Sequence, residues 1–252
     1  MNRIKRSVRF YLQYVNKTET VTLAYYFILG LVPMITLINM VCGYLELNTT
    51  LIINSIGEIL PSNISPIIAS MFMERKTSLL SWFTIIICIY VSSKGTYRMI
   101  LAVDKMYHVR QEMSFLNLQL HAIFDIFLIM VLFTAALFGF GLLPTLMKEA
   151  GLAQYTFLPT VIGFFIVFLM LLIVYKTVPS IHLRFRDCIL GALCATVLFA
   201  GIALFYTIYL KFAKMSNVYG DYAWLALVLM SVEYFCQAIY FGFAVNALIY
   251  IE

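Results

Sequence analysis

Long apolar runs, separated by short polar stretches, form most of the chain. A helix needs ~20 apolar residues to cross the hydrocarbon core of a bilayer. Six runs reach about that length, at residues 23–45, 79–97, 122–143, 158–178, 188–210 and 222–250. The pattern predicts an all-α fold, a polytopic integral membrane bundle of six transmembrane helices that together form one membrane domain, residues 1–252.

Two further segments are predicted to be helical without crossing the membrane. In residues 1–20 the apolar positions share one face of a helix, and the arginines with Lys17 occupy the other. That segregation indicates an amphipathic helix on an anionic membrane surface. In residues 46–78 two apolar stretches are too short to span and are separated by Pro61. This segment predicts short helices in the first outer loop.

Composition supports a membrane class. Hydrophobic residues make up 63% of the chain and charged residues 12%, whereas soluble domains carry about 25% charged residues. A soluble protein of this composition would expose large apolar surfaces. The five cysteines lie in or beside apolar runs and show no Cys-x-x-Cys spacing. They are therefore interpreted as small buried hydrophobes, with no metal site and no disulfide framework.

The basic residues predict the orientation of the bundle. With the N-terminus inside, twelve lysines and arginines fall in cytoplasmic segments and five in outer segments. The excess of inward basic residues favours a cytoplasmic location for both termini. The net charge of +5 is thus typical of contact with anionic lipid head groups, and no nucleic acid is expected as a partner.

Ionisable and amide side chains inside the spans are the candidate functional residues. Glu233 and Gln237 lie one helical turn apart in the sixth run, and His121 and Asp125 do so in the third. Such residues usually face a polar cavity or a partner. One hypothesis is that these four side chains line a substrate cavity. The alternative is that Glu233 pairs with a base such as Lys94 and only locks two helices together.

Two other features, a stripe of basic residues and a proline within a span, have more than one interpretation. Lys94, Arg98 and Lys105 form one stripe of a continuing helix. Reaching the membrane surface is the favoured interpretation, and a seat for a lipid phosphate is the other. Pro33 lies near the middle of the first span, where it predicts a kink that serves either as a hinge or as a packing feature. Pro144 is expected to end the third span.

Several short motifs, in order, resemble those of the YihY/BrkB family. They include Ala24-Tyr25-Tyr26 with Pro33, Asp104-Lys105-Met106-Tyr107, Tyr175-Lys176-Thr177-Val178-Pro179, Arg186-Asp187 before Gly191-Ala192, Tyr209, Tyr219-Gly220 and Gly242. The sixth span departs from the family pattern. An aromatic pair is replaced by Ser231 and Glu233, and a Gly-Ala-Glu triplet by Gly242-Phe243-Ala244. The resemblance implies a six-span protein of the bacterial cytoplasmic (inner) membrane, described as a permease and connected with lipid traffic.

These observations together favour a translocator of a lipid or another amphipathic anionic substrate. We expect no cofactor and no enzymatic activity, because the sequence has no soluble catalytic domain, metal-ligand motif or platform for RNA. A ribonuclease label attached to the family is disfavoured on the same grounds. Small-residue faces such as Gly191 with Ala195 would allow a homodimer. The alternative functions are a scaffold that docks an envelope complex through residues 46–78, and an enzyme that uses His121 and Asp125 as base and orienter.

Overall fold

The computed structural model describes residues 2–44, 79–109, 114–149, 158–212 and 220–251. Their regular structure consists of helices, which confirms the all-α class. The helices are α1 (Asn2–Tyr14), α2 (Lys17–Tyr44), α5 (Leu79–Met106), α6 (Phe115–Glu149), α7 (Leu158–Thr177), α8 (Phe185–Phe212) and α9 (Gly220–Ile251). The predicted short helices of residues 46–78 lie outside the described part of the chain.

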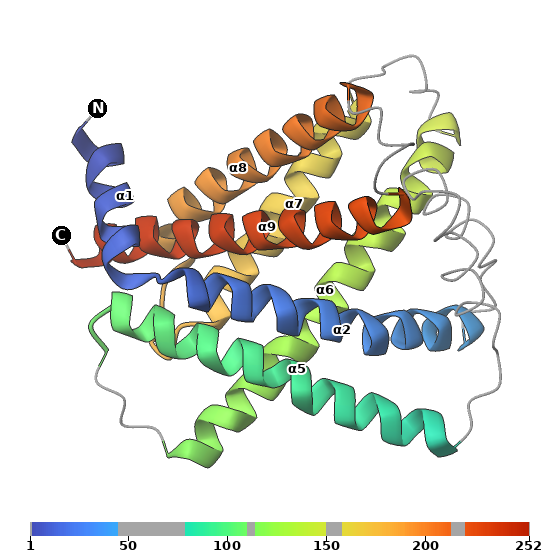
Figure 1. Cartoon of the computed structure of the whole chain (residues 1–252), viewed down its shortest axis with the longest axis horizontal. Coiled ribbons are helices and arrows are strands. Elements are labelled where there is room, and N and C mark those ends of the chain that lie inside the picture. Colours follow the sequence, from blue (N-terminus) through green and yellow to red (C-terminus); the bar gives the residue numbers. More distant parts are fainter. Residues whose placement is uncertain (1, 45–78, 110–113, 150–157, 213–219, 252) are drawn as a thin grey trace.

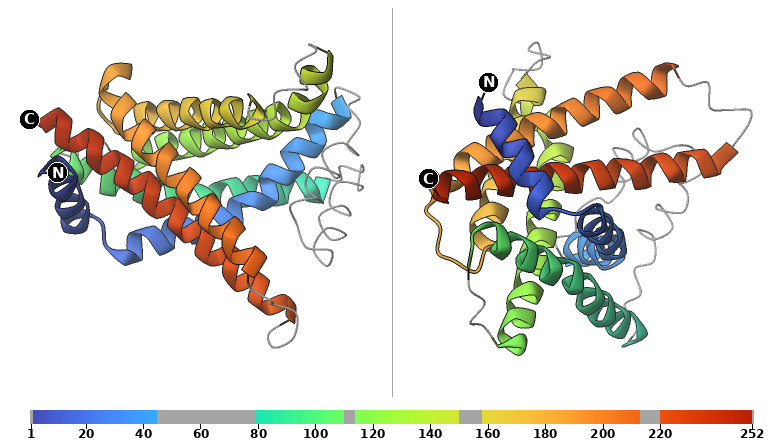
Figure 2. Two further views of the ribbon diagram at one scale, coloured as in Figure 1. Left: turned by 90° about the horizontal axis from the view of Figure 1, so that it is seen from above. Right: turned by 60° about the vertical axis from the view of Figure 1, so that its left-hand side comes forward.

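The long helices run back and forth between two ends of the bundle (Figure 1). Both chain termini lie at one end, which we call the terminal end, together with α1, the last turns of α5, α7 and α9, and the first turns of α6 and α8. The opposite end is the far end. Helix α2 packs against α5 and α9, and α8 packs against α7 and α9. Helices α8 and α9 diverge from each other toward the far end (Figures 1 and 2).

Within the described residues, four helices have the length and composition of membrane spans. Their spanning segments are Phe115–Ala136, Leu158–Thr177, Phe185–Tyr209 and Leu229–Ile251. They correspond to the third through sixth predicted spans, which supports the membrane class. Helices α2 and α5 have 28 residues each and carry the first two predicted spans, whose crossing of a membrane stays a prediction.

Several helices extend beyond the predicted spans. Helix α5 continues past residue 97 to Met106, as the stripe of Lys94, Arg98 and Lys105 predicted, and α6 begins at Phe115, ahead of the span predicted from residue 122. Helix α6 also continues through Pro144 to Glu149. Proline removes only the backbone bond to the carbonyl four residues earlier, and long helices in membrane proteins tolerate that loss. Pro33 likewise lies inside a continuous α2.

Helix α1 is present as predicted, but its apolar residues do not all face the same surroundings. Val15, directly after α1, is buried, and the Tyr11 ring lies 5.9 Å from the Phe241 ring of α9. Val8 and Leu12, by contrast, are 41% and 67% exposed. One side of α1 therefore packs on the bundle. Whether Val8 and Leu12 contact a membrane surface stays a prediction.

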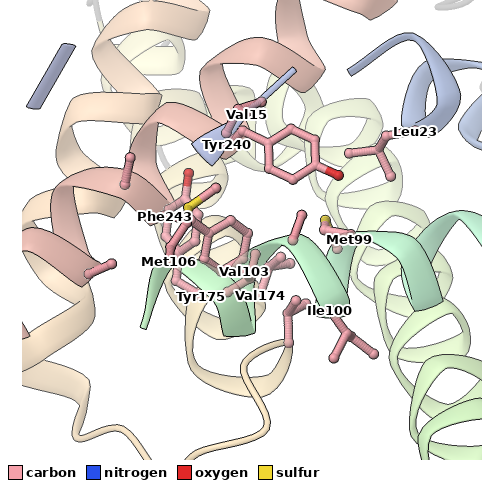
Figure 3. Packing of buried hydrophobic residues seen from close by; sticks show 14 of the residues in the cluster. Val15, Leu23, Met99, Ile100, Val103, Met106, Val174, Tyr175, Tyr240 and Phe243 are labelled. Carbon is pink, nitrogen blue, oxygen red and sulfur yellow. The ribbon is translucent and has the colours of Figure 1, made fainter. Parts of the chain in front are cut away.

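The buried core lies at the terminal end, where α5, α7 and α9 meet (Figure 3). Its largest fully buried apolar side chains are Ile100, Val103, Met106, Tyr175, Tyr240 and Phe243. The Tyr175 and Phe243 rings meet edge to face, with centroids 4.5 Å apart. That geometry is favoured for aromatic pairs beyond the area they bury.

Glycines allow α8 and α9 to approach closely within this core. A methyl group on Gly242 would overlap the Tyr175 hydroxyl, which donates a hydrogen bond to the Ile239 carbonyl at 3.1 Å. A methyl group on Gly191 would overlap the Gly242 carbonyl and the Asn246 amide. Small residues at such positions are the usual means of close helix packing in membranes.

Polar side chains also join the helices at the terminal end. The buried Asn246 amide accepts a hydrogen bond from the Gly191 N–H at 2.6 Å and donates one to the Cys188 carbonyl at 3.3 Å. The buried Asp104 carboxylate accepts hydrogen bonds from the Ser180 N–H (3.0 Å) and hydroxyl (2.6 Å). Asp104 thereby ties the end of α5 to the segment between α7 and α8.

Candidate functional site

The first predicted polar pair forms on α9. The Gln237 Nε2 donates a hydrogen bond to Glu233 Oε1 at 3.2 Å, and both side chains are half-buried. The pair lies where α9 leaves the core. Met230 and Tyr234 are 51% and 46% exposed, whereas Cys236 is 2% exposed. Glu233 and Gln237 therefore lie at the boundary between packed protein and apolar surface.

Helix α1 comes near the same pair. Burial raises the pKa of the Tyr11 phenol, and the negative charge of Glu233 raises it further. The carboxylate of Glu233 is thus within electrostatic reach of the Tyr11 hydroxyl. The N-terminal helix consequently contributes a polar group close to the α9 pair, which the sequence pattern did not predict.

The second predicted pair forms on α6. His121 Nε2 lies 3.4 Å from Asp125 Oδ2 and 3.1 Å from the carbonyl of Thr177, the last residue of α7. A carbonyl oxygen can only accept, so Nε2 carries the hydrogen. The His121 side chain is 24% exposed, and that of Asp125 is completely buried. The pair therefore links α6 to the end of α7.

Asp125 lacks the donors that usually accompany a buried carboxyl group. Neither of its oxygens has a hydrogen-bond partner among the described residues, and the same is true of His121 Nδ1. Because α6 begins at Phe115, Asp125 lies ~15 Å along the helix. That is deeper than the single turn the sequence suggested. An ionisable group at this depth without donors is expensive to charge.

The basic candidates face outward rather than toward these pairs. Lys94 and Arg98 are exposed on α5, as is Lys105. The Lys94 ammonium lies 5.2 Å from the centre of the Tyr90 ring. It therefore contacts that ring rather than forming an ion pair with Glu233. The remaining candidate, Pro33, lies inside α2. Its side chain is outside the described part of the structure.

Further along α9, two residues on the same side of the helix as Glu233 belong to the core. Tyr240 and Ala244 are completely buried in the hydrophobic cluster. In Figure 3 the Tyr240 ring lies between Val15 and Leu23. Its hydroxyl has no hydrogen-bond partner among the described residues. On this side of α9, the partly exposed candidate residues are therefore Glu233 and Gln237.

Another polar contact was missed. The Gln119 Nε2 of α6 donates a hydrogen bond to the Ser93 hydroxyl of α5 at 2.8 Å. Beside it the Ser92 hydroxyl is buried without a partner, 3.3 Å from where a methyl group on Gly30 would lie. The sequence gives no sign of the Gln119–Ser93 contact, because Gln119 lies between the predicted second and third spans.

The described ranges contain no candidate cluster of metal ligands. No three side chains among their His, Cys, Asp and Glu residues converge as metal ligands would. The arrangement can instead bind hydrogen-bonding groups at Glu233 and Gln237, and exchange a proton at His121 and Asp125.

Comparison with known proteins gave two matches. The model of a family described as "Virulence factor BrkB" matches residues 17–251. A protein of Bacillus subtilis (strain 168) named "Putative ribonuclease-like protein YfkH" is 25% identical over 268 residues, covering 99% of this chain and 96% of that protein. No solved structure matches. The matched range begins at α2 and leaves out α1.

Proposed function

The chain belongs to the Virulence factor BrkB family, and from that premise we propose that it translocates a lipid or another amphipathic anionic substrate across or within the cytoplasmic membrane. The supporting observation is the half-buried Glu233–Gln237 pair inside a membrane span. Lipid tails cannot hydrogen-bond to a carboxylate or an amide. The pair therefore fits a polar ligand group at that depth.

Apolar surface on the far halves of α8 and α9 suits the tails of such a substrate. On α8, Leu204, Phe205 and Ile208 are 54–70% exposed. On α9, Met230 is exposed on the far-end side of Glu233. A polar pair bordered by exposed apolar side chains matches a molecule with a polar head and apolar tails.

The charged side chains limit which substrate head groups would fit. Lys94, Arg98 and Lys105 are exposed along α5, where they attract anionic head groups. Glu233 is an acceptor when ionised and repels a bare phosphate, but it can accept hydrogen bonds from hydroxyl or amine groups. We therefore propose an anionic lipid whose head group also carries such donors. Neighbouring membrane lipids with anionic head groups would be the main partners.

The same proposal covers location and orientation. We place the protein in the bacterial cytoplasmic membrane with both termini in the cytoplasm. The two termini lie at one end of the bundle, as an even number of crossings requires. The excess of lysines and arginines in the segments on that side supports the cytoplasmic assignment.

We also propose that the protein is not an enzyme, although its Bacillus subtilis relative has a ribonuclease-like name. Support comes from the position of the candidate residues within apolar helices, where RNA has no access. Purified protein should leave a labelled RNA intact. Cleavage that co-purifies with the protein and disappears in a His121→Ala variant would contradict this. The scaffold alternative rests on residues 46–78, which lie outside the described part.

The translocator proposal is tested in liposomes. Fluorescent phosphatidylglycerol, which is anionic and carries hydroxyl donors, is placed in both leaflets, and a membrane-impermeant quencher is added outside. Wild-type protein should expose the inner-leaflet label at a rate well above that of protein-free vesicles. Glu233→Gln should slow that rate about tenfold, equivalent to about 1.4 kcal/mol, because the carboxylate acceptor is lost.

A matched control is Tyr234→Phe, one residue further along α9. Its side chain is 46% exposed and no described hydrogen bond depends on it, so the rate should not change. A phosphatidylcholine label, which lacks head-group donors, should move more slowly than phosphatidylglycerol. Equal rates with and without protein would eliminate the translocator proposal.

A further inference from the structure

We propose that His121 and Asp125 form a proton-binding site, in which Asp125 holds the proton and His121 passes it to and from water. Its use as the coupling site of translocation rests on the proposed function. Its existence as a proton site does not, because it follows from the geometry alone. No other described group combines complete burial, an ionisable carboxyl and an adjacent imidazole.

The surroundings of Asp125 favour a neutral acid. The side chain is completely buried, and both oxygens lack hydrogen-bond donors among the described residues. Buried carboxylates in proteins are stabilised by several donors or by a paired cation. Among the described residues its ionisable contact is His121 Nε2 at 3.4 Å, which is longer than a hydrogen bond between charged groups. A bound proton removes the unmet charge.

The imidazole is less suited to hold the proton permanently. Its Nε2–H points at the Thr177 carbonyl, 3.1 Å away. Adding a second proton would place an N–H at Nδ1, which is buried without an acceptor in the described structure. An unsatisfied buried donor is unfavourable. The neutral imidazole leaves only a lone pair there, so the resting proton belongs on Asp125.

Relay through His121 follows from its position. Its side chain is 24% exposed, whereas that of Asp125 is fully enclosed. Nδ1, the ring nitrogen that can accept a further proton, is buried in the packed state, so water protonates it when the α6–α7 contact loosens. The ring then passes its Nε2 proton to Asp125 Oδ2, 3.4 Å away, and is left neutral with its hydrogen on Nδ1. The imidazolium that forms in between lies beside the carbonyl of Thr177 at the C-terminal end of α7. The partial negative charge of a helix C-terminus stabilises such a cation.

Other charged groups on the packed elements are occupied elsewhere. From α5, the Lys94 ammonium lies over the Tyr90 ring, and Arg98 is exposed. From α7, the Lys176 ammonium lies 3.7 Å over the Phe185 ring, and the Tyr175 hydroxyl bonds to the Ile239 carbonyl. From the described part of α2, the Tyr25 and Tyr26 rings pair with each other. Among the described residues, none of these groups forms an ion pair or a hydrogen bond with Asp125.

Loss of the proton would have a structural consequence. A carboxylate at this position requires water or donors that the packed α6–α7 contact does not provide. The contact at the His121–Thr177 hydrogen bond would therefore loosen on deprotonation and close again on protonation. Such a two-state contact is how a proton can drive a conformational change between membrane helices.

Infrared difference spectroscopy tests the site without any substrate. Purified full-length protein in detergent is compared between about pH 5 and about pH 9, the range in which a histidine relay operates. Wild type should show the carbonyl band of a protonated carboxylic acid, and Asp125→Asn should abolish it. Glu233→Gln, which removes another carboxyl within a span, should retain it. His121→Gln should retain the band but slow its change after a pH jump about tenfold or more.

Each outcome has a defined meaning. Absence of the band in wild type, or its persistence in Asp125→Asn, overturns the proposal. An unchanged rate in His121→Gln overturns the relay. If Asp125→Asn does not fold, Asp125→Glu should shift the band frequency instead, and an unshifted band is equally contradictory. Liposomes that show no lipid movement, from protein that keeps the band, would refute the translocator proposal and leave the proton site standing.

Discussion

Helices α8 and α9 form two different regions along their length. Toward the terminal end they are joined by the Gly191–Gly242 approach and by the Asn246 amide. Toward the far end, seven of the nine residues from Gly201 to Tyr209 are exposed, and a methyl group on Gly201 would have no neighbour within 4 Å. Helix α8 is thus packed as part of a protein core at its terminal end and exposed to its surroundings over residues 201–209.

This difference indicates that contacts at the terminal end determine how the helices are arranged. Interhelical hydrogen bonds from Tyr175, Asn246, Asp104 and His121 all lie at the terminal end. In lipid, apolar contact alone does not hold helices together, so close packing and hydrogen bonds fix the arrangement. The described interhelical hydrogen bonds therefore leave the far half of α8 unconstrained. Glu233 and Gln237 lie where one regime changes into the other.

The test with the largest expected effect adds a methyl group to one glycine at the terminal end and to one glycine in the far half of α8. Gly242→Ala is expected to destabilise the protein by about 1–3 kcal/mol or more, because the new methyl group overlaps the Tyr175 hydroxyl. Gly201→Ala should be neutral or stabilise by up to about 1 kcal/mol, because alanine favours helix and meets nothing there. Thermal unfolding in detergent, followed by loss of the monodisperse species, measures both.

The two variants control each other, since each adds one methyl group to a glycine of a membrane helix. Equal losses at the two positions would show that the far half is packed as tightly as the terminal half. A Gly242→Ala variant as stable as wild type would mean that the close approach of α7, α8 and α9 is not what fixes the core.

Sequence patterns predicted the helices well, because apolar length alone determines which segments can cross a membrane. The i, i+4 spacing likewise predicted that His121 meets Asp125 and that Gln237 meets Glu233. Both relations are local, so no knowledge of the tertiary arrangement was needed. Helix ends were less predictable. At Pro144 the surrounding α6 overrides the local preference to stop.

Contacts between helices could not be predicted in the same way. Thr177 contributes a backbone carbonyl to His121, and a carbonyl leaves no mark in the sequence. Asn246 stands out as an amide in an apolar run, but its partners on α8 become visible only when α8 and α9 are placed together. Lys94 was a reasonable partner for Glu233 by charge. In the fold it lies over Tyr90.

A second test removes one hydrogen-bonding side chain from each of the two regions, with a smaller expected effect. Asn246→Ala leaves the Gly191 N–H and the Cys188 carbonyl without their side-chain partner, and should lower stability by about 1–3 kcal/mol. Thr207→Ala removes an exposed side-chain hydrogen bond to Ala203 in the far half. It should change stability by less than about 0.5 kcal/mol.

The outcome is measured by the same unfolding assay. Asn246→Asp adds a further comparison, because it keeps the acceptor for Gly191 but loses the donor to Cys188 and buries a charge. It should be less stable than Asn246→Ala. Similar stability of the Asn246 and Thr207 variants would contradict the view that polar contacts at the terminal end hold the pair.

The smallest expected effect concerns Tyr107, a terminal-end residue whose polar group appears in no hydrogen bond among the described residues. Its hydroxyl is buried, and burial first, then the nearby Cys188 and Asp187, raises the pKa of the phenol. At pH 7 Tyr107→Phe should change stability by less than about 1 kcal/mol, since only an unpaired hydroxyl is removed. Above about pH 10 the unfolded phenol loses its proton while the folded one keeps it. Wild type should therefore lose stability there relative to Tyr107→Phe, and unfolding curves that stay parallel from pH 7 to about 10.5 would show that water reaches this part of the core.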